Sequence, residues 1–436
     1  MKKLFTVIIS VVVTLLASAQ TSINSPYSQY GFGTLSEQSS GFNRGMNGVG
    51  IGFREHNQVN FLNPASYSEM DSLMFLFDVG VSGQITNFSE GEKKKNAKNA
   101  NFEYVVAGFR MAKHLGISFG LVPFSSVGYS YSGREPLDHE GSVYYNNTYS
   151  GSGSTRMVYL GAGWQPFKNF SIGLNASYLW GDYSRSISNK YEDGTGSGSS
   201  SINTLSKVYT ATINSYKLDF GAQYTLPLSK KDRLTVGVTY SPGHKVSKNP
   251  QCEVTSLNSS TSVTNKTTQV VSEGIKLPDM FAAGVSLSHN NQLKVGVDYS
   301  LQKWADVGFP DYISKNGSSN YMLNNQYFSD RHKVILGGEY CRNESARGFL
   351  YRLRYRAGVS YSSPYVKING KDGPREISVS AGFGIPIKNV WNSRSQLNIS
   401  GQWVNVSGTN LVAENTFRIN IGITFNERWF MKWMVK

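Results

Sequence analysis

The sequence predicts an all-β protein, a 14-stranded antiparallel transmembrane β-barrel with an N-terminal plug inside the lumen. Three observations lead to this prediction. The chain opens with a secretory signal, most of the remainder alternates between apolar and small or polar residues, and long polar connections alternate with short turns. Together they argue against a cytoplasmic enzyme and against a helical membrane protein.

Residues 1–19 have the organisation of a signal peptide. Lys2 and Lys3 precede an apolar stretch that ends at Leu16, and a small-residue cleavage site follows at residues 17–19. The apolar stretch is too short to cross a bilayer as a helix. The mature chain should therefore begin at Gln20, outside the inner membrane.

An alternation of apolar and polar residues with a period of two predicts the strands. In 417–425 the odd positions are Phe and Ile, whereas the even positions are Arg, Asn, Gly and Thr; 216–224 and 234–240 behave alike. Aromatic residues gather at the strand ends. This pattern is typical of a barrel whose apolar face meets lipid and whose polar face lines the lumen.

The connections give the strand number. Short turns are expected near 113, 167–169, 229–232, 290–291, 342–348 and 388–394, and long loops at 87–100, 132–153, 184–206, 243–278, 303–330, 362–375 and 406–416. Their strict alternation predicts 14 strands, an even number that lets the barrel close without a lipid-exposed edge. Short turns then face the periplasm.

The expected domains are the signal peptide (1–19), a plug or hatch (20–71), the barrel (72–425) and a periplasmic aromatic and basic tail (426–436). The stretch 41–71 is rich in Gly and Asn and has no sustained period. Because such a segment forms no core of its own, we expect it to lie inside the barrel.

Two stretches resemble a known family. Asn63-Pro64-Ala65 stands directly before the first strand, and residues 277–284 read LPDMFAAG before a later one. With the strand number, these features are similar to the FadL/TodX-type outer-membrane transporters. The resemblance implies a bacterial outer membrane location, a plug motif at Asn63, Pro64 and Ala65, and passive uptake of hydrophobic small molecules such as long-chain fatty acids, with lateral release through the wall.

Pro123 interrupts the third strand. Proline has no N–H for the ladder, so a kink or bulge is expected, with Ser125 and Ser126 bonding the freed groups. The resemblance implies that this kink opens the wall laterally. The alternative is a harmless bulge at the outer interface.

Arg352, Arg354 and Arg356 alternate with apolar residues, which places them on the lumen face of one strand, and Glu339 lies on the lumen face of the preceding strand. One interpretation is a structural ladder paired with Glu339 and plug carboxylates. The other is a seat for an anionic ligand head, held by bidentate contacts.

No cluster of metal ligands, nucleophile motif or cofactor fingerprint is present, so we expect neither an enzyme nor a cofactor. The net charge is +14 and its residues are scattered. This favours contact with outer-membrane lipid and lipopolysaccharide over nucleic acid. Cys252 and Cys341 are expected at opposite rims, without a bridge.

The tail Asn426–Lys436 mixes Trp, Phe and Met with basic residues, which suits either an anchor in the inner leaflet or a docking surface for a protein partner. The function that we expect is uptake of a hydrophobic ligand through the lumen, and the alternative is a FadL-like, non-transporting subunit of an outer-membrane complex for secretion or barrel assembly. The polar loops weigh against the transporter.

Overall fold

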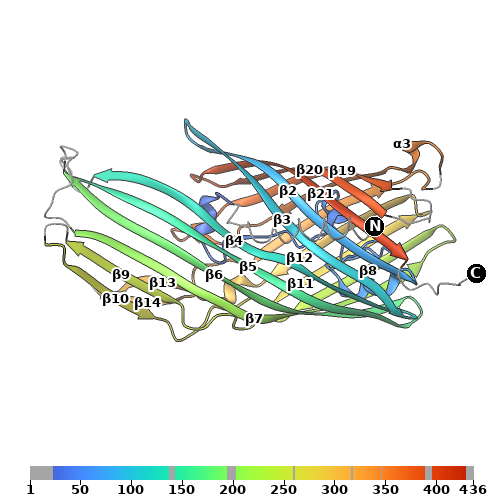
Figure 1. Cartoon of the computed structure of the whole chain (residues 1–436), viewed down its shortest axis with the longest axis horizontal. Coiled ribbons are helices and arrows are strands. Elements are labelled where there is room, and N and C mark those ends of the chain that lie inside the picture. Colours follow the sequence, from blue (N-terminus) through green and yellow to red (C-terminus); the bar gives the residue numbers. More distant parts are fainter. Residues whose placement is uncertain are drawn as a thin grey trace, which may run out of the picture.

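The computed structural model describes residues 23–136, 143–193, 203–258, 261–315, 318–344, 346–387 and 395–428. The predicted signal peptide and residues 429–436 of the tail lie outside them. The fold is a closed antiparallel barrel, so the protein is a bacterial outer-membrane β-barrel (Figure 1). Its strands are β2 (Met74–Glu90), β3 (Lys93–Ala112), β4 (Leu115–Pro136), β5 (Val143–Phe167), β6 (Phe170–Asp193), β7 (Asn203–Pro227), β8 (Asp232–Ser241), β11 (Met280–His289), β12 (Leu293–Gln302), β15 (Arg331–Tyr340), β16 (Arg354–Ser362), β19 (Arg375–Ile387), β20 (Ser395–Ser407) and β21 (Ala413–Arg428).

The 14 strands and their closure confirm the predicted fold class. Strand β21 pairs with β2, so that Gly80 lies opposite Gly422 and the sheet closes on itself. On β21 the side chains of Phe417, Ile419 and Ile421 are exposed on the outer surface, whereas Asn420 is buried on the lumen side. The two-residue period therefore separates a lipid face from a lumen face, as the alternation indicated.

The wall is much taller on one side. Strands β4 to β7 have 22 to 25 residues, whereas β8 has 10, and Figure 1 shows the long strands reaching far beyond the others at the left. The hairpin of β9 (Gln251–Asn258) and β10 (Thr264–Val270) continues this sheet by pairing with β7. The opposite end carries the short turns and is periplasmic by the usual rule.

Several expected loops are in fact strands. Of 87–100, 132–153 and 184–206, most residues belong to β2 to β7. Their composition is polar because these strand extensions lie beyond the lipid, where no apolar face is required. The predicted boundary at 425 also differs, since β21 continues to Arg428, which pairs with Met74.

The remaining elements lie in connections. They are η3 (Trp304–Asp306), β13 (Phe309–Lys315), β14 (Ser318–Asn324), α3 (Phe349–Arg352), β17 (Lys367–Ile368) and β18 (Lys371–Asp372). No helix in the described part of the chain is long and apolar enough to cross a membrane. Cys252 on β9 and Cys341 after β15 are both buried and free.

Residues 23–71, here called the N-terminal segment, fill the lumen. They contain η1 (Pro26–Gln29), β1 (Thr34–Leu35), α2 (Gly41–Arg44) and η2 (Pro64–Glu69), and most of their side chains are buried. The segment starts at the extracellular rim, where Tyr27 donates to the Val412 carbonyl (2.5 Å), and leads into β2 at the periplasmic rim. The barrel core is thus built between this segment and the inner wall.

Candidate functional site

Rows of lumen-facing glycines let the N-terminal segment lie directly on the backbone of the wall. One row consists of register partners on four neighbouring strands, Gly116 on β4, Gly163 on β5, Gly173 on β6 and Gly221 on β7. A Cβ on Gly116 would lie 1.9 Å from the Tyr67 carbonyl oxygen. These rows were not predicted from the sequence, because only the strand register brings the four glycines side by side.

The Asn63-Pro64-Ala65 triplet sits on this row. The Asn63 side chain caps η2 by accepting from the Ala65 N–H (3.1 Å), and its amide donates to the Ile51 carbonyl (3.0 Å). A Cβ on Gly173 would lie 2.3 Å from the Pro64 carbonyl carbon. The three residues therefore form a capped turn pressed against β6 and β7.

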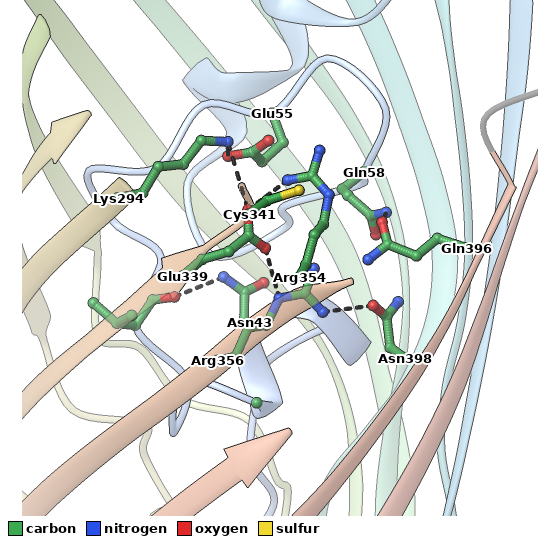
Figure 2. A network of polar contacts seen from close by, with 12 residues as sticks. Asn43, Glu55, Gln58, Lys294, Glu339, Cys341, Arg354, Arg356, Gln396 and Asn398 are labelled. Atoms are coloured by element: carbon green, nitrogen blue, oxygen red, sulfur yellow. Dashed lines mark hydrogen bonds and ion pairs between the residues drawn. The ribbon is translucent and has the colours of Figure 1, made fainter. Parts of the chain in front are cut away.

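A second anchor is the ionic network of Figure 2. Glu339 on β15 accepts from Arg356 Nε (2.7 Å) and from Arg354 Nη1 (2.5 Å), and its side chain is almost fully buried. Lys294 on β12 bridges to the N-terminal segment through Glu55 (2.5 Å). Paired, hydrogen-bonded charges of this kind are tolerated inside a protein, and removing one partner is costly.

The predicted arginine ladder is therefore only partly as expected. Arg354 and Arg356 lie on β16 and meet Glu339, but Arg352 ends helix α3 and lies before the strand. The alternation in the sequence begins two residues too early, because the turn itself contains a short helix. Two carboxylates of the N-terminal segment, Glu69 and Asp71, pair within the segment, with Arg54 (2.9 Å) and His56 (2.9 Å).

Another ionic group lies nearer the extracellular side. Arg44 pairs with Glu103 on β3 (2.8 Å), and Glu37 accepts from Gln402 (2.8 Å) and lies 3.5 Å from Arg418. Burial alone would raise the pKa of Glu37, but the charges of Arg418, Arg44 and Lys333 lower that pKa to about 2. This carboxylate of the N-terminal segment is therefore ionised at neutral pH.

The barrel wall splits between β3 and β4. These strands pair only where residues 105–112 meet residues 115–121. Towards the extracellular end, each strand continues without pairing with the other. Strand β1 of the N-terminal segment takes the vacant side of β4, with Thr34 opposite Ser126 and Leu35 opposite Ser125. We call this split, with its β1 filling, the seam.

Pro123 lies at the base of the seam. The β4–β5 register shifts between Pro123 and Ser125, where the sequence predicted a break in pairing. The Pro123 carbonyl accepts from the Gln38 side chain (2.7 Å) and the Phe124 carbonyl from the Ser36 N–H (2.9 Å). From the sequence, the hydroxyls of Ser125 and Ser126 were expected to bond the backbone groups freed at Pro123. The hydrogen-bond donors that the structure shows at the Pro123 and Phe124 carbonyls belong to the N-terminal segment.

Two cavities open into the lumen, and charged groups line both. One, of about 370 Å³, lies beside the seam and touches ten charged side chains, among them Glu37, Lys217, Asp298, Lys333 and Arg418. The other, of about 830 Å³, lies at the periplasmic mouth. Its lining includes Arg54, Glu55, His56, Arg233 and Arg342. Among the described residues no group of His, Cys, Asp and Glu could hold a metal ion.

Solved structures with a similar fold include channels and transporters of aromatic hydrocarbons. The CymD monoaromatic hydrocarbon channel shares 16% identity, with 89% of this chain and 97% of that chain covered and a TM-score of 0.57. The Ralstonia pickettii toluene transporter TbuX shares 13% identity, with 89% of this chain and 98% of that chain covered and a TM-score of 0.57. The P. putida toluene transporter TodX shares 13% identity, with 91% of this chain and 100% of that chain covered and a TM-score of 0.58. At such identities the likeness shows the fold alone. All three are named as channels or transporters, and none as an enzyme.

A search of curated proteins found no match. A family model described as BamG matches residues 1–435, which is nearly the whole sequence. The resemblance to FadL/TodX barrels thus holds for the fold, while the matched family carries a different name. The chain belongs to the BamG family.

Proposed function

We propose that this protein is a non-transporting subunit of an outer-membrane protein complex, built on a barrel of the hydrophobic-channel fold. The observation that carries the proposal is that the N-terminal segment fills the lumen and is held there by tight contacts. The N-terminal segment is fastened to the wall by backbone contact at the glycine rows and by the buried ion pairs of Arg44 with Glu103 and of Lys294 with Glu55. A barrel filled in this way serves better as a scaffold than as a pore.

The chemistry of the lumen cavities supports the same role. A hydrophobic ligand is held in sites lined mainly by apolar and aromatic side chains. The cavity beside the seam mixes apolar side chains, such as Leu35, Phe88 and Phe102, with ten charged ones, among them Glu37, Lys217 and Asp298. An apolar compound placed there would remove water from these groups and return no hydrogen bonds, which costs several kcal/mol. The family name BamG fits a part in barrel assembly.

Two surfaces are available to partners. The extracellular extensions of β4 to β7, together with β9 and β10, form a sheet that stands above the rest of the barrel (Figure 1). The periplasmic mouth is open through its polar cavity of about 830 Å³. We propose the aromatic and basic tail, of which residues 429–436 lie outside the described residues, as a further contact for a protein partner.

The test is purification from the native outer membrane in mild detergent, followed by mass spectrometry. An affinity tag can be inserted at Gly91, because this turn residue has open space around it. We expect a stoichiometric outer-membrane or periplasmic protein. A chain truncated after Arg428, with the same tag, is the matched variant for the role of the tail. Recovery of the tagged barrel alone, with stoichiometric fatty acid, would overturn the proposal.

A second candidate is passive uptake of hydrophobic small molecules, such as long-chain fatty acids, with lateral release. The seam favours it, because the wall there is closed by the N-terminal segment and not by a neighbouring barrel strand. The substitution Pro123→Val should then leave folding intact but reduce uptake of a radiolabelled fatty acid. Uptake by Pro123→Val that equals wild-type uptake would count against this route.

A further inference from the structure

The extracellular half of the barrel contains a cavity that the proposed function does not use. It has a volume of about 350 Å³ and lies between the tall wall, the β13–β14 hairpin, the β17–β18 turn and the start of the N-terminal segment. Each of these elements contributes to its lining. The volume falls within the range of small-molecule sites.

Aromatic rings form much of the lining. Six of the lining residues are tyrosines, and Phe309 joins two of them. The Phe309 ring lies 5.0 Å from the Tyr327 ring and 6.4 Å from the Tyr183 ring, and both pairs are stacked. Tyr30 approaches Tyr327 at 6.3 Å. A tyrosine offers an apolar ring face together with a polar hydroxyl, which suits a ligand that has both kinds of surface.

The polar groups of the lining are varied. Asp311, Gln326, Lys367 and Asn369 are at least partly exposed in the cavity wall. They offer carboxylate and amide acceptors together with amide and ammonium donors. A purely apolar compound would leave these groups without partners, and a simple anion would meet Asp311.

Arg185 supplies an independent indication of a ligand. Its side chain is buried, its Nη2 donates to the Gly31 carbonyl, and its guanidinium carbon lies 4.7 Å from the Tyr183 ring and 5.0 Å from the Phe309 ring. Its Nε has no hydrogen-bond partner in the part of the chain that the structure describes. A buried donor without a partner is unfavourable, and a small shift of the Arg185 side chain would let a ligand oxygen in the cavity accept from it.

We propose that this cavity binds a pyranose sugar, as part of a polysaccharide or glycan at the cell surface. The tyrosine rings would stack against the C–H face of the sugar, while Arg185, Asp311 and Gln326 would exchange hydrogen bonds with its hydroxyl groups. The cavity lies on the extracellular side, where such glycans occur. This inference goes beyond the proposed subunit role, because it gives the chain a ligand of its own.

Saturation-transfer NMR on the full-length protein in detergent micelles tests the inference. The probes are methyl glycosides of glucose, galactose, mannose and N-acetylglucosamine at about 10 mM, a concentration suited to millimolar affinities. We expect saturation of the ring C–H protons of at least one glycoside. Tyr327→Leu and Gln326→Ala should each weaken that signal about fivefold or more.

Tyr351→Leu is the matched control, because Tyr351 is a half-exposed tyrosine of α3 at the periplasmic end. It should leave the signal unchanged. Gln326→Ala changes an exposed side chain, so it reports on binding even if Tyr327→Leu fails to fold. Absence of saturation with every glycoside, or an equal signal in wild type and Gln326→Ala, would overturn the inference. A partner protein that copurifies, or fails to, has no bearing on this result.

Discussion

The carbonyl oxygen of Tyr67 lies against Gly116 of β4, so closely that a Cβ at Gly116 would stand 1.9 Å from it. Tyr67 is fully buried, and its hydroxyl donates to Asn175 on β6 (3.0 Å). One residue of the N-terminal segment therefore touches two strands of the wall. This close approach shows why the lumen face of β4 carries glycine at this position.

Adding a methyl group at this contact should displace the N-terminal segment. We expect Gly116→Ala to lower the temperature at which the barrel loses its compact migration on gels, because the clash involves backbone atoms that cannot move away separately. Gly83→Ala on β2 is the control, since a Cβ there meets nothing within 4 Å. Equal heat-modifiability of the two variants would contradict the tight seating of the segment.

The Glu339 network should respond strongly to loss of its carboxylate. Glu339→Leu leaves the buried guanidinium groups of Arg354 and Arg356 without their main counter-charge, which should cost roughly 3–5 kcal/mol of unfolding free energy. Glu344→Leu is the control. Glu344 also pairs with Arg354, but its side chain is half exposed, so the loss should be about 1 kcal/mol or less. Urea titration in micelles measures both changes, and similar losses would argue against a network centred on Glu339.

The seam predicts a specific cross-link. Leu35 and Ser125 are opposite each other in the β1–β4 ladder, so cysteines at these two positions should form a disulfide on mild oxidation. The native Cys252 and Cys341 are both buried, which limits competing reactions. A pair at Leu35 and Ser82 on β2 serves as the unmatched control. If both pairs cross-link equally, β1 is not held at the seam.

Acid should weaken the anchoring of Glu37. Its folded-state pKa is lowered from 4.5 to about 2, so its contribution to stability is present above about pH 4.5 and is lost as the pH falls towards 2. Glu37→Gln should therefore lower the unfolding temperature at pH 6 and reduce its fall between pH 5 and pH 2. Glu92→Gln, at an exposed turn, should leave the profile as in wild type. If the unfolding temperature of Glu37→Gln depends on pH as that of the wild type does, Glu37 does not stabilise the fold through its ion pair.

The sequence by itself determined the fold class, the number of barrel strands and which side chains of each strand face outwards. Every strand that faces lipid needs an apolar side and a complete set of backbone hydrogen bonds. This requirement applies to each strand separately, so it leaves a local alternating pattern in the sequence, as in Phe417 to Phe425. The break at Pro123 was likewise visible, since the missing N–H is a property of one residue.

The sequence indicated that the N-terminal segment fills the lumen, but only the tertiary structure decided which contacts hold it there. The seam depends on where β3 and β4 stop pairing, and the ion pair of Arg44 with Glu103 depends on how the segment is threaded. The extensions of β4 to β7 lie beyond the lipid, so nothing imposed an apolar face that would mark them as strands. Arg352 was misplaced because a short helix in the turn shifts the start of β16. These features arise from contacts between residues distant in the chain, and such contacts leave no periodic trace in the sequence.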